Sequence, residues 1–194
     1  MGGVVMKHNI PACIERFKEI LGENYSRLGL KGNGEGTGMM ESFEKGSITA
    51  DEFVQKILKY SKKGTTADEI ILAWNLMHAG IPQERIDMLR ELKEDGYRLY
   101  LLSNSNSIHW KDICDNYSID GMFEDVFLSF VEHCLKPDEK FFRTVERRID
   151  PSGEQILFTD DLAANRCAAE KPGWRVCSSI EELRKLEIAE IHFT

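Results

Sequence analysis

The chain has 194 residues, of which 42% are hydrophobic and 30% are charged, and this balance is typical of a soluble globular protein. Its formal net charge of −8 argues against a nucleic-acid-binding protein, because such proteins need a basic surface to neutralise phosphates. No apolar run approaches the ~18 residues of a membrane span, and the N-terminus does not resemble a signal peptide. We therefore expect a cytoplasmic protein that binds neither nucleic acid nor membranes.

The cysteines indicate a reducing compartment. Their number is odd, their spacing is irregular, and no two of them form a C-x-x-C pair. This pattern is typical of free thiols rather than of disulfides or a zinc site. The five are Cys13, Cys114, Cys134, Cys167 and Cys177.

The first 80 residues are predicted to be mainly helical. Residues 2–6 have the character of the tail of a strand and the turn after it, and nothing in the sequence precedes them. A helix is expected over 11–21, with proline at its start and glycine after its end. Capping boxes at Thr49 and Thr66 open two more helices. The glycine-rich stretch 32–38 is predicted to be a flexible connector rather than a phosphate cradle, because no strand precedes it and no Lys-Ser/Thr follows it.

The second half alternates between strand and helix patterns. After a helix over 82–95, strands are expected at 97–102, 126–130, 155–159 and 174–177, with helices to about Tyr117 and over 137–148, 162–170 and 180–186. Such alternation predicts a parallel sheet with right-handed crossovers. We therefore expect an α/β fold with a parallel-sheet, Rossmann-like core made of residues 1–10 and 81–194. Residues 11–80 would form a small helical cap inserted into it.

Polar side chains follow three of these strands. Ser103 and Asn104 end the first, where a hydroxyl and free backbone N–H groups at a helix start can hold a phosphoryl oxygen. Lys136 follows the second and can neutralise negative charge there. Asp160 and Asp161 end the third, and paired carboxylates favour a bound Mg²⁺. Since ligands bind at the carboxyl ends of parallel strands, the sequence predicts a metal-assisted phosphoryl site.

Each element taken alone also has an ordinary interpretation. Ser103 could be a helix cap, Lys136 a surface lysine, and Asp160–Asp161 acids that stabilise a helix N-terminus. The combination is more specific, because the order is Ser, Lys, then Asp-Asp, with about one βα unit between successive elements. That order excludes receiver domains of two-component signalling, in which the acidic pair comes first.

The same residues resemble the haloacid dehalogenase superfamily of hydrolases. The likeness is strongest to the subgroup containing bacterial sugar-phosphate (glucose-1-phosphate) phosphatases, and it extends over essentially the whole chain. It implies a helical cap inserted after the first strand, a Mg²⁺ cofactor, a small phosphorylated metabolite as substrate, and an aspartyl intermediate that water hydrolyses. The matching stretches are Gly2-Gly3-Val4-Val5, residues 101–106, Lys136-Pro137-Asp138, and residues 158–161 with Asn165.

The resemblance assigns roles to individual residues. Ser103 and the Asn104 N–H would bind the phosphoryl group, and Lys136 would link nucleophile and phosphate electrostatically. Asp161 would bind Mg²⁺, with Asp160 supporting it or contacting it through water. Candidate substrate-facing residues are Asn106, His109, Trp74 and His78. Among these, Trp74 fits the core better, and a lone histidine such as His109 is more often structural.

The likeness breaks at the nucleophile, which would be an aspartate one residue before Met1. We interpret the chain as N-terminally truncated and expect it to be inactive as printed. The position of the general acid used by many phosphatases of the superfamily is occupied by Gly2. Two alternatives stay open: a non-catalytic binding protein with this fold, and a 2-haloacid dehalogenase, which should not need metal. A monomer or weak dimer is expected.

Overall fold

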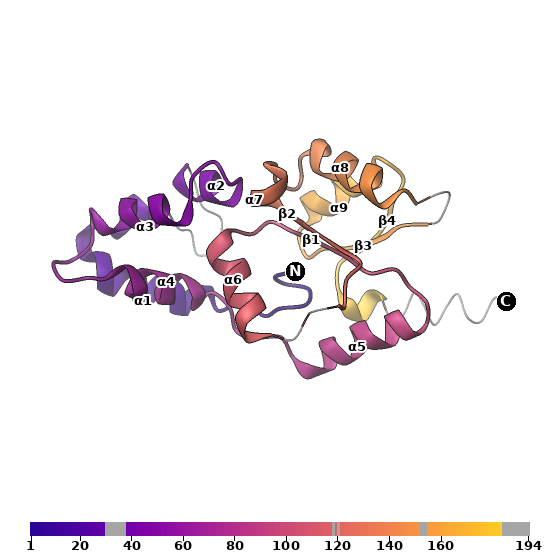
Figure 1. Cartoon of the computed structure of the whole chain (residues 1–194), viewed down its shortest axis with the longest axis horizontal. Coiled ribbons are helices and arrows are strands. Elements are labelled where there is room, and N and C mark those ends of the chain that lie inside the picture. Colours follow the sequence, from indigo (N-terminus) through magenta and orange to yellow (C-terminus); the bar gives the residue numbers. More distant parts are fainter. Residues whose placement is uncertain (30–37, 118, 120, 152–154, 184–194) are drawn as a thin grey trace.

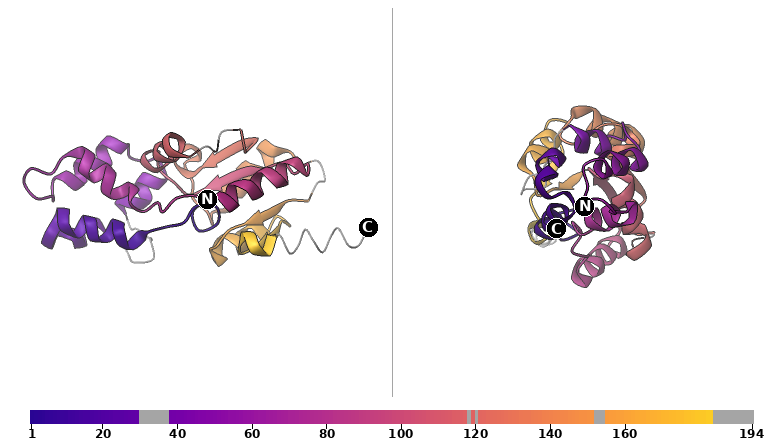
Figure 2. Two further views of the ribbon diagram at one scale, coloured as in Figure 1. Left: turned by 90° about the horizontal axis from the view of Figure 1, so that it is seen from below. Right: turned by 90° about the vertical axis from the view of Figure 1, so that its left-hand side faces the viewer.

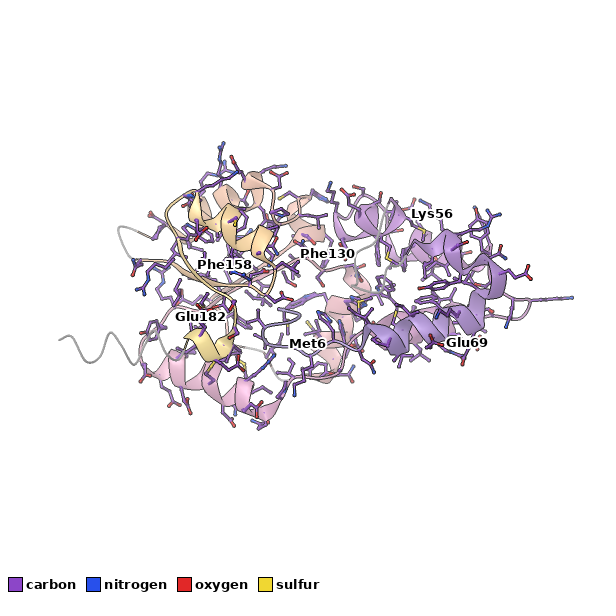
Figure 3. The ribbon with its side chains drawn as sticks, turned by 180° about the vertical axis from the view of Figure 1, so that it is seen from behind. Met6, Lys56, Glu69, Phe130, Phe158 and Glu182 are labelled. Atoms are coloured by element: carbon purple, nitrogen blue, oxygen red, sulfur yellow. The ribbon has the colours of Figure 1, made fainter. Side chains whose placement is uncertain are left out.

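The computed structural model describes residues 1–29, 38–117, 119, 121–151 and 155–183. The molecule is elongated, with a helical unit at one end and an α/β part at the other (Figure 1). Figure 3 labels Lys56 and Glu69 on the helical unit and Phe158 in the α/β part, with Met6 between them. Almost all of the glycine-rich stretch lies outside the described residues, so its predicted role as a connector stays a prediction.

The helical unit consists of α1 (Ile10–Leu21), η1 (Gly22–Leu28), α2 (Met39–Glu44), α3 (Ala50–Leu58) and α4 (Ala67–Asn75). Both capping boxes form: the Thr49 and Thr66 hydroxyls accept from backbone N–H groups three residues on, and Glu52 and Glu69 return the bond. The unit has its own hydrophobic core, in which Phe53 stacks on Phe43. The short elements η1 and α2 were not predicted, because neither carries a sustained apolar period.

The α/β part begins at α5 (Gln83–Glu94) and alternates strand and helix as expected. It continues with β1 (Tyr100–Ser103), α6 (Ser107–Asn116), β2 (Asp125–Leu128), α7 (Ser129–Glu132), α8 (Glu139–Ile149), β3 (Leu157–Thr159), α9 (Ala163–Glu170) and β4 (Arg175–Cys177). The strands pair in parallel, β1 with β2 and β3 with β4. The predicted α/β class with parallel strands is therefore confirmed. The helix expected over 180–186 is described only to residue 183, and residues 180–183 are helical.

Two predictions about the sheet were wrong. The strand expected over 126–130 ends at Leu128, because Ser129 already begins α7. The four strands also form two separate two-stranded sheets rather than one open sheet. The β1–β2 sheet and the β3–β4 sheet lie on opposite sides of the α/β part in Figure 2. Residues of β1 and β3 line one apolar cavity of about 440 Å³ between the two sheets.

The two chain segments that link the helical unit to the α/β part, residues 7–9 and 77–80, are hydrogen-bonded to each other. The Lys7 N–H donates to the Gly80 carbonyl over 2.9 Å, and the Ala79 N–H donates to the Lys7 carbonyl over 2.8 Å. The Asn9 N–H donates to Met77 over 2.8 Å, and His8 pairs with His78 as an antiparallel bridge. The two linking segments therefore form a short two-stranded ribbon.

Two further observations bear on the bulk properties. None of the five cysteines, all of which lie among the described residues, forms a disulfide. Among the residues that the structure describes, no helix is long and apolar enough to span a membrane.

Candidate functional site

The predicted strand-end residues meet at one place. Ser103 ends β1, and Lys136 lies in the loop before α8. Asp160 follows β3, and all three residues are buried. The Lys136 Nζ donates to the Asp160 Oδ2 over 2.6 Å and to the Leu102 carbonyl over 3.0 Å. One ammonium group thus joins the carboxyl ends of β1 and β3, which belong to different sheets.

The loop that carries Lys136 is held by Asn104. The Asn104 Nδ2 donates to the Lys136 carbonyl, and the Lys136 N–H donates to the Asn104 Oδ1, each over 2.9 Å. Among the described residues, the Ser103 Oγ makes one hydrogen bond, a 3.3 Å contact to the Asn104 carbonyl. The Ser103 hydroxyl is therefore held by a longer hydrogen bond than the Asn104 amide, and it can rotate to hydrogen-bond a ligand.

Asp160 has no free carboxylate oxygen. Its Oδ2 accepts from Lys136, while its Oδ1 accepts from the Leu162 N–H over 3.0 Å and from the Asn165 Nδ2 over 2.9 Å. Burial by itself raises the pKa of Asp160, but the Lys136 charge and these hydrogen bonds outweigh it and hold the pKa below its usual range. Asp160 is therefore a charged partner of Lys136, and a direct contact with a metal ion would require these bonds to change.

Asp161 differs from its neighbour. Within the described ranges no hydrogen bond or ion pair to its carboxylate is recorded, and the residue is exposed. The carboxylate lies against Gly3: a Cβ built on that glycine would come within 2.3 Å of the Asp161 Oδ2. Gly3 also has a φ of 74°, which favours glycine. A carboxylate with free oxygens suits Mg²⁺, which keeps several waters and often takes one or two protein carboxylates together with substrate phosphate.

The N-terminal residue Met1 also lies near this group of charged residues. Its backbone nitrogen is buried and lies within electrostatic reach of Lys136, Asp160 and Asp161. The Met1 carbonyl accepts from the N–H groups of Val4, Val5 and Met6, so residues 1–6 form a tight turn beside the strand ends. No cluster of three or more His, Cys, Asp or Glu side chains suited to a metal occurs in the described part of the chain. Asp161 would thus need a further oxygen ligand near Met1 or from a substrate.

Asn106 and His109, which are predicted to bind the phosphate, are hydrogen-bonded to Trp74 of the helical unit. Both are buried, and the Asn106 Oδ1 accepts from the Trp74 Nε1 and from the His109 N–H. The His109 Nε2 contacts the Trp74 carbonyl over 3.1 Å, and its Nδ1 contacts the Asn106 Nδ2 over 3.2 Å. These side chains connect α6 to the helical unit. Their predicted contact with substrate stays a prediction, and Trp74 is a core residue, as expected.

The partners of His109 fix its protonation. A carbonyl can only accept, so the Nε2 carries the hydrogen, and the Nδ1 accepts from the Asn106 amide. Burial lowers the pKa of His109 to about 3, with a smaller contribution from His78. The ring centroid of His78 lies 4.4 Å away, and the His78 Nδ1 contacts the Asp112 Oδ2 over 2.9 Å. His109 is therefore neutral at pH 7.

This neutrality predicts a pH-dependent stability. Below about pH 6.5 the unfolded chain protonates His109 and the folded chain does not, so folding is weakened as the pH falls toward 3. The loss from this group is about 1.4 kcal/mol per pH unit, or about 2 kcal/mol at pH 5. Urea unfolding at pH 7 and pH 5 should show a smaller pH effect in His109→Gln than in the unchanged protein. An equal pH effect in both proteins would refute the assignment.

Ser129 is a site residue that the sequence pattern missed. Its Oγ donates to the Glu44 carbonyl over 2.6 Å, lies 3.0 Å from the Ser105 carbonyl, and accepts from the Ser105 N–H over 2.9 Å. Nearby, a Cβ on Gly46 would come within 2.2 Å of the Phe130 carbonyl oxygen. Ser129 thus holds the loop after β1 against the helical unit. No local motif marks it, because its partners are 24 and 85 residues away.

Known proteins match this chain over most of its length. A sesquiterpene phosphatase of Aspergillus oryzae is 29% identical over 135 residues, which are 69% of this chain and 68% of that protein. A D-ribitol-5-phosphate phosphatase of Bacteroides thetaiotaomicron is 25% identical over 135 residues, which are 66% of this chain and 65% of that one.

A solved structure shares the fold. It is a HAD family enzyme from Bacteroides thetaiotaomicron, crystallised as the wild-type protein with magnesium and inorganic phosphate. Its TM-score to this chain is 0.82 at 31% identity, covering 92% of this chain and 90% of that one. Residues 7–171 match the family model of haloacid dehalogenase-like hydrolases. The protein therefore belongs to the haloacid dehalogenase-like hydrolases.

Proposed function

We propose that this protein is a Mg²⁺-dependent phosphatase of a small phosphorylated metabolite. The observation that carries the proposal is the convergence of Ser103, Lys136 and Asp160 beside the free carboxylate of Asp161. An anionic phosphoryl group can be bound there by the Ser103 hydroxyl and the Lys136 charge. The phosphatases among its relatives support the same class of reaction.

The proposed chemistry needs a nucleophile that the printed chain does not contain. An aspartate directly before Met1 would lie in the same charged environment, because the charges of Lys136 and Asp161 act on the buried Met1 nitrogen. Its carboxylate would attack phosphorus and release the alcohol of the substrate, and water would then hydrolyse the aspartyl phosphate to inorganic phosphate. Mg²⁺, bound by Asp161, would offset charge on the phosphoryl oxygens. The chain as printed would bind metal and phosphate without turnover.

Residues 11–80 are proposed to act as a cap that selects the substrate. They have a hydrophobic core of their own, and they contact the α/β part through Trp74, which donates to Asn106, and through the Glu44 carbonyl, which accepts from Ser129. We further propose that the protein works in the cytoplasm as a monomer or weak dimer.

Two measurements test this function. Titration calorimetry should show Mg²⁺ binding that Asp161→Asn abolishes and that the exposed control Asp115→Asn leaves unchanged. A form with aspartate directly before Met1, on an upstream strand, should hydrolyse p-nitrophenyl phosphate with Mg²⁺ and stop with EDTA. The same form with asparagine there should be inactive.

The outcomes separate the alternatives. Metal and phosphate binding without turnover by the aspartate form would favour a non-catalytic binding protein. Release of halide from a 2-haloacid in the presence of EDTA would favour a dehalogenase, although the free carboxylate of Asp161 favours a metal-dependent site.

A further inference from the structure

The imidazole ring of His8 lies at the edge of the candidate site. A Cβ built on Gly2 would come within 2.0 Å of the His8 Nε2 and within 2.3 Å of its Cε1, so the ring packs directly on this glycine. The next residue, Gly3, approaches the Asp161 carboxylate in the same way. The His8 ring and the Asp161 carboxylate therefore lie against adjacent residues of the tight turn formed by residues 1–6.

The ionisation of His8 is linked to charged groups of the site. Burial of the ring lowers the pKa of His8, and the positive charges of His78 and of the Met1 nitrogen lower it further. A hydrogen bond to the Met77 carbonyl and the charge of Asp161 act in the opposite direction but do not outweigh the burial. The ring is therefore neutral at neutral pH, and a neutral imidazole keeps one nitrogen as a proton acceptor.

The position of His8 is fixed, but the residue is open to solvent. It is the middle residue of the linking segment 7–9, and it pairs with His78 of the other linking segment as an antiparallel bridge. On either side of it, the N–H groups of Lys7 and Asn9 donate to carbonyls of that other segment over 2.9 Å and 2.8 Å. His8 as a whole is exposed, so a proton on its ring can exchange with water. These are the properties of a group that transfers protons.

The proposed reaction needs such a group in both of its steps. The leaving oxygen must gain a proton when the alcohol is released, and the water that hydrolyses the aspartyl phosphate must lose one. Lys136 and Asp160 are bonded to each other in a buried ion pair. Of the other histidines, His109 is bonded through both ring nitrogens, and the His78 Nδ1 contacts a carboxylate of α6. These four side chains are therefore less suited to the task than His8.

We propose that His8 is the residue that transfers the proton in the phosphatase reaction of this protein. In the hydrolytic step its ring takes a proton from water while the water oxygen bonds to phosphorus and the bond from phosphorus to the aspartate breaks. In the next turnover the protonated ring gives that proton to the alcohol oxygen as the bond from this oxygen to phosphorus breaks. One water is thus consumed in each cycle. The inference rests on the proposed function for the reaction itself.

The first test uses the chain as printed, so it does not depend on the folding of a variant. Inorganic phosphate with Mg²⁺ should raise the pKa of His8 by about 1, because a bound anion stabilises the charged ring. The pKa is followed by NMR of the ring signals, which the spectrum of His8→Gln assigns. Sodium chloride at the same ionic strength should have a much smaller effect. The backbone amide of Asn104 reports phosphate binding independently.

The outcomes of this titration separate the two proposals. Phosphate that shifts the Asn104 amide but leaves the pKa of His8 unchanged would overturn the role of His8 and leave the proposed function in place. If phosphate does not bind, both proposals are contradicted.

The second test uses the form with aspartate directly before Met1. With p-nitrophenyl phosphate, whose leaving group needs little protonation, His8→Gln should release a burst of p-nitrophenol and then turn over about 100-fold more slowly than the unchanged form. Aspartyl phosphate should accumulate at the same time. Lys7→Gln is the matched control, because Lys7 is an exposed residue of the same linking segment, and it should show neither effect.

A purely structural role of His8 predicts a different pattern. It would slow the burst and the steady state alike, without trapped aspartyl phosphate, and this result would overturn the inference. So would an unchanged steady-state rate in His8→Gln. An aspartate form that is inactive with His8 present would contradict the proposed function, and the role of His8 in turnover would fall with it.

Discussion

Replacing Lys136 by methionine is expected to lower the free energy of unfolding at pH 7 by about 3–5 kcal/mol, because the substitution leaves the buried Asp160 charge without its partner. The side chains of this ion pair are only 4% and 5% exposed. The hydrogen bonds from Asn165 and the Leu162 N–H would remain, but they cannot supply a positive charge. Urea denaturation of Lys136→Met measures the loss.

The pH dependence of this loss is also predicted. Without Lys136, burial would raise the pKa of Asp160, since the lysine charge is what chiefly opposes that effect. The carboxyl group would then take up a proton more readily. The loss in free energy of unfolding caused by Lys136→Met should therefore become smaller as the pH is lowered. Lys171→Met is the matched control, because Lys171 forms an exposed ion pair with Glu139. It should change stability little. Equal losses in the two variants would show that the burial of the Lys136–Asp160 pair has no energetic weight.

Replacing Trp74 by alanine is expected to cost about 3–5 kcal/mol of stability, which is typical for the truncation of a buried aromatic side chain. The indole packs against Phe53 and stacks on His109, with ring centroids 5.1 Å and 4.9 Å away. It also donates to the Asn106 Oδ1. Trp74→Ala would therefore leave a cavity and also break the link between the helical unit and α6.

Two further variants separate these effects. Trp74→Phe keeps most of the packing and removes the hydrogen-bond donor, so it should cost less than Trp74→Ala while still loosening the loop after β1. Leu72→Ala, on the same helix, is the control, because Leu72 is 66% exposed. Thermal unfolding ranks the three, and a Leu72→Ala loss as large as that of Trp74→Ala would contradict the predicted order.

The convergence of the site was predictable because it depends on a general rule. The carboxyl ends of parallel strands in one sheet share an edge, and this rule predicted that Ser103 and Asp160 would come close. In the structure β1 and β3 belong to different sheets, and Lys136 joins their carboxyl ends. The role of Asp160 was harder to foresee. Paired aspartates suggest a shared cation, but in the folded chain Lys136 and Asn165 take the oxygens of Asp160 and leave only Asp161 free.

Other features depended on contacts between residues distant in sequence. Asn106 and His109 follow a strand end, which predicts ligand contact, yet packing of α4 against α6 brings Trp74 to both side chains. Ser129 appeared to continue an apolar strand, and only its distant partner, the Glu44 carbonyl, shows why a serine stands there. The division into two sheets was also not predictable, because strand patterns in sequence do not specify which strands become neighbours.

The two hydrogen-bonded linking segments, residues 7–9 and 77–80, limit how the helical unit can move. Two independent linkers would let it swing in any direction, whereas a hydrogen-bonded ribbon bends easily only out of its own plane. Any movement of the helical unit relative to the α/β part should therefore follow one arc about this pair of segments. A ligand that ordered residues 7–9 would thereby also order residues 77–80, so that both ends of the helical unit would respond together.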